Sequence, residues 1–244
     1  MGYRQSSPNS NNLKRFMLQH PLFSFFFMAY AFSWITLIPY IFSEWGILPH
    51  KSVYKLFFVL NPFAGPTLAA YIMNRLTGGT NFRKRLKQFQ VGWKWYAFIL
   101  LGIPAVLLFG TIILPGAIKS FRGFTSSFFI TYPLNFIIIF FLGGPLGEEI
   151  GWRGYALPRM QSRFGEWRAT LLLGVLWTFW HLPHFLTSAQ RGGPGTGLSI
   201  IYKNLPIFFL AVMATTIIFT WVFNHTKGSL FIVILLHTSI NSYA

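Results

Sequence analysis

The chain of 244 residues contains no cysteine and no aspartate, so its only acidic side chains are four glutamates. The absence of cysteine excludes disulfides, thiol catalysis and cysteine-bound metals, and it leaves the redox compartment undetermined. Charged residues make up only 10% of the sequence, against about 25% in a soluble domain. With 53% apolar and 20% aromatic residues and a mean hydropathy of +0.50, the composition is typical of a polytopic membrane protein.

Lysine and arginine total 20 residues and give a formal net charge of +16, a balance that can indicate nucleic-acid binding. These residues fall between long apolar runs, where the topology of a membrane protein explains them better. We therefore expect membrane lipid, and no nucleic acid, among the partners of this chain.

Apolar runs of about 20 residues, the length needed to cross a bilayer, recur along the chain. We predict an all-α, polytopic membrane bundle of seven transmembrane helices, or eight if one segment is split. Residues 1–20 are predicted to form a polar N-terminus and residues 21–244 a single membrane domain. The first apolar run is too long for a signal-peptide core and lacks a small-residue cleavage site, so we expect it to be retained. The predicted spans are 21–42, 53–74, 95–115, 128–147, 168–187, 199–223 and 228–243.

The unequal distribution of basic residues between alternate loops predicts the orientation. The N-terminus, segments 75–94 and 153–168 and the last loop hold three, six, four and one of them, 14 in all, against 6 on the opposite side. Because cytoplasmic loops carry such an excess, we predict a multi-pass protein of the cell membrane with a cytoplasmic N-terminus. Residues 81–93 could form either an amphipathic interfacial helix or a solvated loop.

Two of the four glutamates, Glu148 and Glu149, are adjacent and follow a long apolar run. An ionisable group in hydrocarbon costs roughly 2.5–3.5 kcal/mol on insertion scales, so such groups usually mark a functional site. Glu149 and Arg153 have i, i+4 spacing with the acid first, the favourable order for a helical ion pair. Glu148 lies about 100° further round the helix and is out of register with Arg153. We therefore predict that Arg153 holds Glu149 while Glu148 faces another helix; the alternative is a solvated pair at the membrane surface.

Further polar side chains interrupt the later apolar runs. His181 and His184 lie in the fifth predicted span, and His237 and Asn241 lie in the last one. His181 shares a helix face with Trp177, and His237 shares one with Asn241, because both pairs are spaced i, i+4. Each histidine alone could be a packing residue with a satisfied hydrogen bond.

Counted from the predicted cytoplasmic ends, Glu148, His181 and His237 could meet in the inner half of the bilayer. One carboxylate, two imidazoles and the amide of Asn241 around one cavity could activate water. Glu148 would then be the general base, while histidine and asparagine stabilise an oxyanion. Two histidines and a glutamate could also bind zinc.

Three segments resemble the motifs of the CAAX prenyl endopeptidase and bacteriocin-processing/abortive-infection family (CPBP, Abi) of intramembrane proteases. EEIGWR at 148–153 fits the EExxxR motif of that family. WTFWH at 177–181 resembles its second motif, an aromatic residue four positions before a histidine, although the family usually has phenylalanine where this chain has Trp177. HTSIN at 237–241 resembles its third motif. The motifs occur in the family's order within residues 143–241, and the first 125 residues match only as generic apolar spans.

The resemblance implies membrane helices around a site that opens to the cytoplasm, with Glu148 activating water. It also implies a structural or substrate-positioning role for Glu149 and Arg153, and we read His184 as either a supporting or a packing residue. The catalytic residues assigned are Glu148, His181, His237 and Asn241, and the supporting ones are Glu149, Arg153, Trp177 and His184. The family is often classed as metalloendopeptidases. We favour a metal-free site because two histidines and a neutral asparagine form a sparse zinc set; if zinc is used, its ligands are Glu148, His181 and His237.

These features predict an intramembrane endopeptidase acting on a prenylated CAAX-like peptide or on a leader or bacteriocin precursor. One alternative is a non-proteolytic bacteriocin immunity or scaffold protein with the same fold. Another is a proton-coupled transporter, which would favour inverted repeats with matching broken helices. The sequence shows no such symmetry.

Overall fold

The computed structural model describes residues 8–49, 52–79, 81–120, 123–188 and 199–242, and all regular structure in these ranges is helical. The first seven residues of the predicted polar N-terminus lie outside the described residues. Short 3₁₀ turns (η1, η5) and π-helical turns (η2, η3, η4) interrupt the α-helices. In chain order the elements are α1 (Pro8–Gln19), α2 (Pro21–Glu44), η1 (Ser52–Tyr54), α3 (Lys55–Pro62), η2 (Phe63–Thr67), α4 (Leu68–Thr77), α5 (Phe82–Leu86), α6 (Trp93–Ala97), η3 (Phe98–Gly102), α7 (Ile103–Ile112), α8 (Ala117–Ser120), α9 (Phe128–Leu142), α10 (Pro145–Glu149), η4 (Ile150–Ala156), α11 (Leu157–Phe164), α12 (Glu166–Trp180), η5 (Leu182–Leu186), α13 (Ser199–His225) and α14 (Leu230–Asn241).

Six helical segments in the described part of the chain are long and apolar enough to cross a membrane. They agree with the first six predicted spans and with a multi-pass membrane protein. The seventh predicted span, 228–243, is wrong in length: α14 has 12 residues, or about 18 Å of helix, against about 30 Å of hydrocarbon. The six segments are Pro21–Glu44, Ser52–Thr77, Trp93–Ile112, Phe128–Phe164, Glu166–Leu186 and Ser199–His225.

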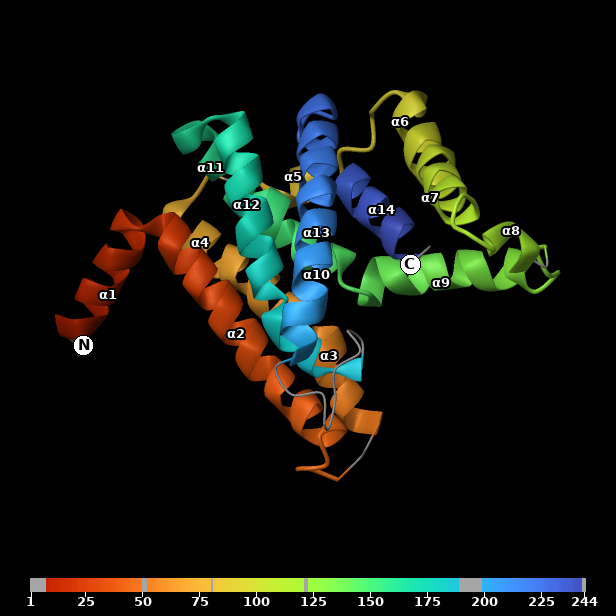
Figure 1. The fold of residues 1–244 in the computed structure, drawn as a ribbon. Coiled ribbons are helices and arrows are strands. Elements are labelled where there is room, and N and C mark those ends of the chain that lie inside the picture. The colour runs from red at the N-terminus through yellow and green to blue at the C-terminus, as the bar shows by residue number, and fades with distance from the viewer. Residues whose placement is uncertain (1–7, 50–51, 80, 121–122, 189–198, 243–244) are drawn as a thin grey trace.

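The helices surround α14, most of whose side chains are buried. Figure 1 shows α12 and α13 side by side, with α2 leaning along them and α9 lying across their direction. The short α14 packs against α9, α10 and α13, so it belongs to the core of the bundle. In contrast, α9 has no buried side chain, although it consists almost entirely of apolar residues. Such a surface is suited to lipid.

The predicted span 128–147 is not one continuous helix, because it breaks at residues 143–144. The backbone of Gly144 has φ +105°, a conformation that glycine adopts without a Cβ clash. Pro145 then occupies the first position of α10, where its fixed φ suits a helix start. As a result, Glu148 lies in the first turn of a new helix instead of at the end of a long one.

Helix α10 and the turn η4 pack closely against η2. A Cβ added to Gly151 would lie 2.4 Å from Cβ of Pro66, so only glycine permits this approach. One turn earlier, Oγ1 of Thr67 donates a hydrogen bond to the backbone oxygen of Gly147 at 2.5 Å. These contacts fix the rotation of the helix that carries both glutamates.

The basic segment after α4 forms a five-residue helix, α5, followed by a loop. The longer helix considered for residues 81–93 is therefore not formed. Oγ of Ser229, at the N-terminus of α14, donates to the backbone oxygen of Gln88 at 2.7 Å. This contact holds the loop against the core. The cytoplasmic placement of the segment stays a prediction.

Candidate active site

The two adjacent glutamates have different partners, although they share a helix. Glu149 and Arg153 are both fully buried, and Nη1 of Arg153 donates to Oε1 of Glu149 at 3.0 Å. The ion pair predicted from the i, i+4 spacing is therefore present. The same oxygen lies 2.8 Å from Nδ1 of His237, which donates to it from α14. Both donors go to Oε1 and offset part of the cost of burying the charge, while Oε2 is buried without a hydrogen-bond partner among the described residues.

Two aromatic rings enclose the guanidinium group of Arg153. Its Cζ lies 4.4 Å from the ring centroid of Trp177 and 4.7 Å from that of Phe219. Because Nε and Nη2 of Arg153 have no hydrogen-bond partner among the described residues, these ring faces provide its remaining stabilisation. The same two rings flank the imidazole of His237, with centroids 5.5 and 5.3 Å away. Glu149, Arg153 and His237 thus form one buried unit that joins η4 to α12, α13 and α14.

Glu148 faces α12. Nε1 of Trp177 donates to Oε2 of Glu148 at 2.7 Å, and the two residues are only 3% and 6% exposed. The other carboxylate oxygen, Oε1, folds back over Gly144, where an added Cβ would lie 2.8 Å from it. Within the described ranges, Glu148 makes no ion pair. Its orientation agrees with the prediction from helical spacing that Glu148 faces another helix.

Glu148 borders a cavity of about 180 Å³. The walls come from α3, from the break after α9, from α10, from the junction of α12 with η5 and from the end of α14. The structure thus brings Glu148, His181 and Asn241 together, as predicted, and adds His184. The polar side chains of the lining are Glu148, His181, His184 and Asn241.

The hydrogen bond of His181 fixes its tautomer. Its Nδ1 lies 2.8 Å from the backbone oxygen of Trp177. A carbonyl oxygen can only accept, so Nδ1 donates and Nε2 of the neutral ring keeps a lone pair. His184 is 7% exposed, and its ring centroid lies 5.4 Å from that of His181. Nδ1 of His184 is buried without a hydrogen-bond partner among the described residues.

A family model described as Type II CAAX prenyl endopeptidase Rce1-like matches residues 129–243, which contain every polar group of the cavity and the buried ion pair. Residues 129–243, 115 of the 244 residues, are thus similar to the Rce1-like type II CAAX prenyl endopeptidases. The chain is also similar to a protein named CAAX prenyl protease 2 from Methanococcus maripaludis, with 30% identity over 154 residues. The alignment covers 62% of this chain and 56% of that relative, so the chain spans little more than half the length of the relative it matches.

Among the residues that carry the Rce1-like motifs, His237 is not placed as the sequence predicted. We expected it to line the cavity with Glu148, but it is not one of the lining residues, and its Nδ1 is bonded to Glu149. The reason is electrostatic, because each donor to the fully buried Glu149 lowers the free energy of burying that charge. The ring of His237 instead contacts the ring of Trp177 edge to face.

The alternative zinc ligands proposed from the sequence are Glu148, His181 and His237. Within the part of the chain that the structure describes, no three histidine, cysteine, aspartate or glutamate side chains are grouped closely enough to hold a metal ion. Nδ1 of His237 donates to Glu149 and Nδ1 of His181 donates to a backbone oxygen, so Nε2 of each ring is the nitrogen left for another partner. The metal-free site and the zinc alternative both stay predictions.

Sequence reasoning missed two aromatic donors on α2 that hold α12 in place. The hydroxyl of Tyr30 donates to the backbone oxygen of Leu176, and Nε1 of Trp34 donates to that of Trp180 at 3.1 Å. Donors and acceptors are each one helical turn apart, so the two bonds fix both the register and the rotation of α12. An i, i+4 pair of aromatic residues with polar groups in an apolar run was the available signal.

The third glutamate, Glu44, was also missed. It accepts hydrogen bonds from the backbone nitrogen of Ser188 at 2.6 Å and from the hydroxyl of the same residue at 2.7 Å. Beside it, Nε1 of Trp45 donates to the backbone oxygen of Leu186 at 2.7 Å. Together they fix the end of η5, the turn that carries His184. An acid directly after the apolar run 21–42 could have indicated this contact.

Proposed function

We propose that this chain is an intramembrane endopeptidase in which Glu148 is the general base that activates water. The observation that carries the proposal is the difference between the two neighbouring carboxylates. Glu149 accepts from both Arg153 and His237, whereas Glu148 accepts from Trp177 and borders the cavity. A general base must be within reach of the water it deprotonates, and of the two glutamates only Glu148 meets that condition.

In the proposed reaction, a water molecule in the cavity transfers a proton to Glu148 while its oxygen attacks the carbonyl carbon of the scissile peptide bond. The carbonyl electron pair moves to oxygen, and the amide of Asn241 donates a hydrogen bond to the resulting oxyanion. The carbon–nitrogen bond then breaks, and Glu148 returns the proton to the departing amine. Each turnover consumes one water and leaves Glu148 ionised.

We assign His181 the orientation of that water. Because its Nδ1 is held by the backbone oxygen of Trp177, its Nε2 lone pair can accept the hydrogen that the water does not give to Glu148. His237 then acts through Glu149 and the ring of Trp177, which makes it a positioning residue.

The size of the cavity limits what it can hold. A volume of about 180 Å³ corresponds to about six waters at roughly 30 Å³ each. The cavity therefore takes only the scissile bond and its neighbours. Two apolar grooves of about 410 and 420 Å³ lie on either side of α12, beside α13 and α2. An isoprenoid chain would fit such a surface, so we propose a prenylated CAAX-like peptide as substrate, reached from the cytoplasm. A leader or bacteriocin precursor is the alternative.

The test is cleavage of a farnesylated CAAX-type peptide by the full chain in proteoliposomes, with mass spectrometry of the released C-terminal fragment. Glu148→Gln should lower turnover by about 10²–10⁴-fold, the usual effect of losing a general base, while its melting temperature stays close to that of the wild type. Glu166→Gln is the matched control, because Glu166 is an exposed glutamate at the start of α12.

An immunity or scaffold protein should retain its cellular phenotype with Glu148→Gln. Undiminished cleavage by that variant would contradict the assignment of the base. Equal loss of cleavage in Glu148→Gln and Glu166→Gln would contradict a specific role for Glu148.

A further inference from the structure

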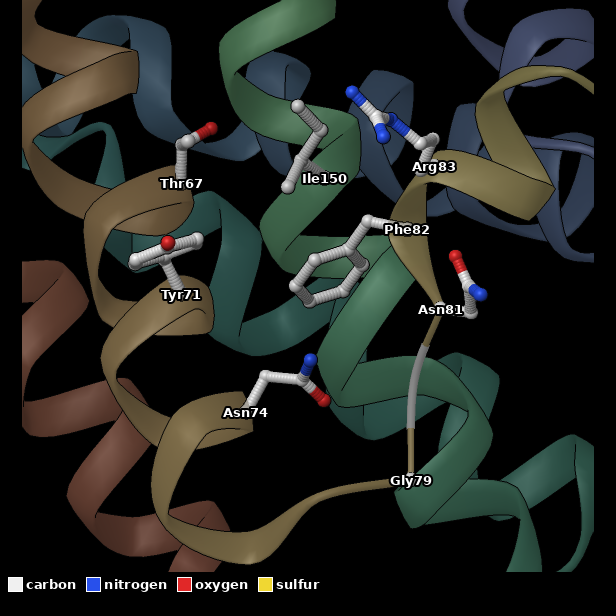
Figure 2. A pocket seen from close by; sticks show the side chains of 8 residues that line it. All are labelled: Thr67, Tyr71, Asn74, Gly79, Asn81, Phe82, Arg83 and Ile150. Atoms are coloured by element: carbon white, nitrogen blue, oxygen red, sulfur yellow. The ribbon is translucent and has the colours of Figure 1, made fainter.

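A second and larger cavity, of about 620 Å³, lies on another face of the helix that carries Glu148. Ile150, which lines it, follows Glu148 by two residues and is therefore about 200° further round the helix. Figure 2 shows Ile150 and Phe82 in the middle of this cavity, with the side chains of α4 on one side and those of the basic segment on the other. The lining residues are Thr67, Tyr71, Asn74, Gly79, Asn81, Phe82, Arg83 and Ile150.

The lining places polar side chains around an apolar centre. In Figure 2, Arg83 lies beside Ile150 and level with Thr67, Asn81 lies nearer to Asn74 and Gly79, and the ring of Phe82 lies between the two walls. The cavity runs along the helix from Thr67 to Asn74, seven residues or about 10 Å. A guanidinium group and neutral polar groups around an apolar centre suit the headgroup and glycerol region of a phospholipid.

Positive charge beside this cavity is not neutralised by the protein. None of the six basic residues of segment 75–94 makes an ion pair with a described residue. Arg83 is exposed and has no hydrogen bond to a described residue, and Nη2 of Arg75 reaches the hydroxyl of Tyr71 at 2.7 Å. Burial, and then the charge of Arg159, lower the pKa of the Arg85 guanidinium below its ordinary value. Mutual repulsion of this kind favours the approach of an anion.

We propose that this cavity binds the headgroup of an anionic phospholipid, with the phosphate on Arg83 and Asn81 and the glycerol region on Phe82 and Ile150. Guanidinium groups match the oxygens of a phosphate in geometry as well as charge. The amide nitrogen of Asn81 is the end of that side chain not used in capping α5, since Oδ1 accepts from the backbone nitrogen of Lys84 at 2.9 Å.

The bound lipid would support the helices of the proposed active site. The ring of Phe82 packs against Gly154 of η4, where an added Cβ would lie 3.3 Å from it. The other end of the basic segment is held to α14 through Ser229 and Gln88. Ile150 belongs to the same helix as Glu148. A lipid that fills the cavity should therefore raise the melting temperature, as any ligand of the folded state does.

The experiment titrates the detergent-purified full chain with phosphatidylglycerol or phosphatidylcholine and measures melting temperature and lipid retention by native mass spectrometry. Arg83→Gln is compared with Lys84→Gln, which removes the same charge from the next residue, also exposed but outside the cavity lining. Phosphatidylglycerol should bind in preference to phosphatidylcholine. Arg83→Gln should weaken its binding by about tenfold, as expected for one lost charge-assisted contact.

A second titration at about 1 M salt separates direct contact from diffuse attraction, because the Debye length falls to about 3 Å. There, Lys84→Gln should bind like the wild type, while Arg83→Gln should remain weakened. Equal effects of the two substitutions would overturn the proposal, as would the absence of a preference for phosphatidylglycerol. Displacement of the lipid by inorganic phosphate would assign the cavity to a small anion instead. None of these measurements uses peptide cleavage, so a negative result would count against lipid binding and not against the proposed function.

Discussion

Trp177→Phe tests whether the indole N–H positions the carboxylate of the proposed base. The substitution removes the donor that lies 2.7 Å from Oε2 of Glu148, while a six-membered ring remains to face Arg153 and His237. The motif that this chain resembles usually has phenylalanine at this position, so the variant is expected to fold. The comparison therefore isolates one hydrogen bond.

The magnitude follows from the burial of both partners. Hydrogen bonds to charged groups contribute about 1.5–3 kcal/mol, and both Trp177 and Glu148 are almost completely shielded from water. The N–H holds the carboxylate in one orientation at the cavity, so its removal should leave the base poorly placed. At about 1.4 kcal/mol per factor of ten in rate, kcat/KM should fall by about 10–100-fold.

The assay is kcat/KM for a farnesylated peptide in proteoliposomes, measured beside the melting temperature of each variant. Trp152→Phe is the matched control, because Trp152 is also fully buried but its Nε1 has no hydrogen-bond partner among the described residues. Its kcat/KM should stay close to that of the wild type. A loss of activity in Trp177→Phe that its lowered melting temperature explains would reduce the role of Trp177 to packing. An equal loss in both variants would refute the argument altogether.

Three further predictions concern the buried ion pair, the break before α10 and the orientation of the chain. Glu149→Gln and Arg153→Ala should each lower the free energy of unfolding by about 3–5 kcal/mol, because each leaves a buried group unpaired; denaturation in detergent should show the double variant losing less than the sum. Gly144→Ala should cost about 1–3 kcal/mol and reduce cleavage, since its φ is +105° and its Cβ would meet the Glu148 carboxylate; Gly110→Ala, in open space on α7, is the control. Lys87→Cys should react with an impermeant maleimide from the cytoplasmic side only, and labelling solely from outside would reverse the predicted orientation.

Helical periodicity predicted the contacts made within one helix. The Glu149–Arg153 ion pair required only that residues 149–153 be helical, and the π-helical turn still brought the two side chains together. The length of apolar runs predicted seven spans, and six of them correspond to segments long and apolar enough to cross a membrane. Both inferences use local geometry, which depends little on how the helices are arranged.

Contacts between helices could be predicted less well from the sequence. The position of His237 depends on the competition between two neighbouring carboxylates for one imidazole, and spacing within α14 says nothing about which carboxylate is closer. The break at residues 143–144 was concealed by a continuous apolar run on its N-terminal side. The shortness of α14 was concealed in the same way, because apolar composition does not distinguish a span from a buried core helix.

Trp177 shows why the two glutamates cannot be treated as independent sites. Its N–H bonds to Glu148, while its ring faces the guanidinium of Arg153, the partner of Glu149. Any change that displaces Arg153 also removes the cation that packs against this ring, and the donor to Glu148 then loses its support. Arg153→Ala should therefore reduce cleavage by more than its lowered stability explains. Residues that act as a unit are expected to combine non-additively, so the structural pair and the proposed base share one energetic network through Trp177.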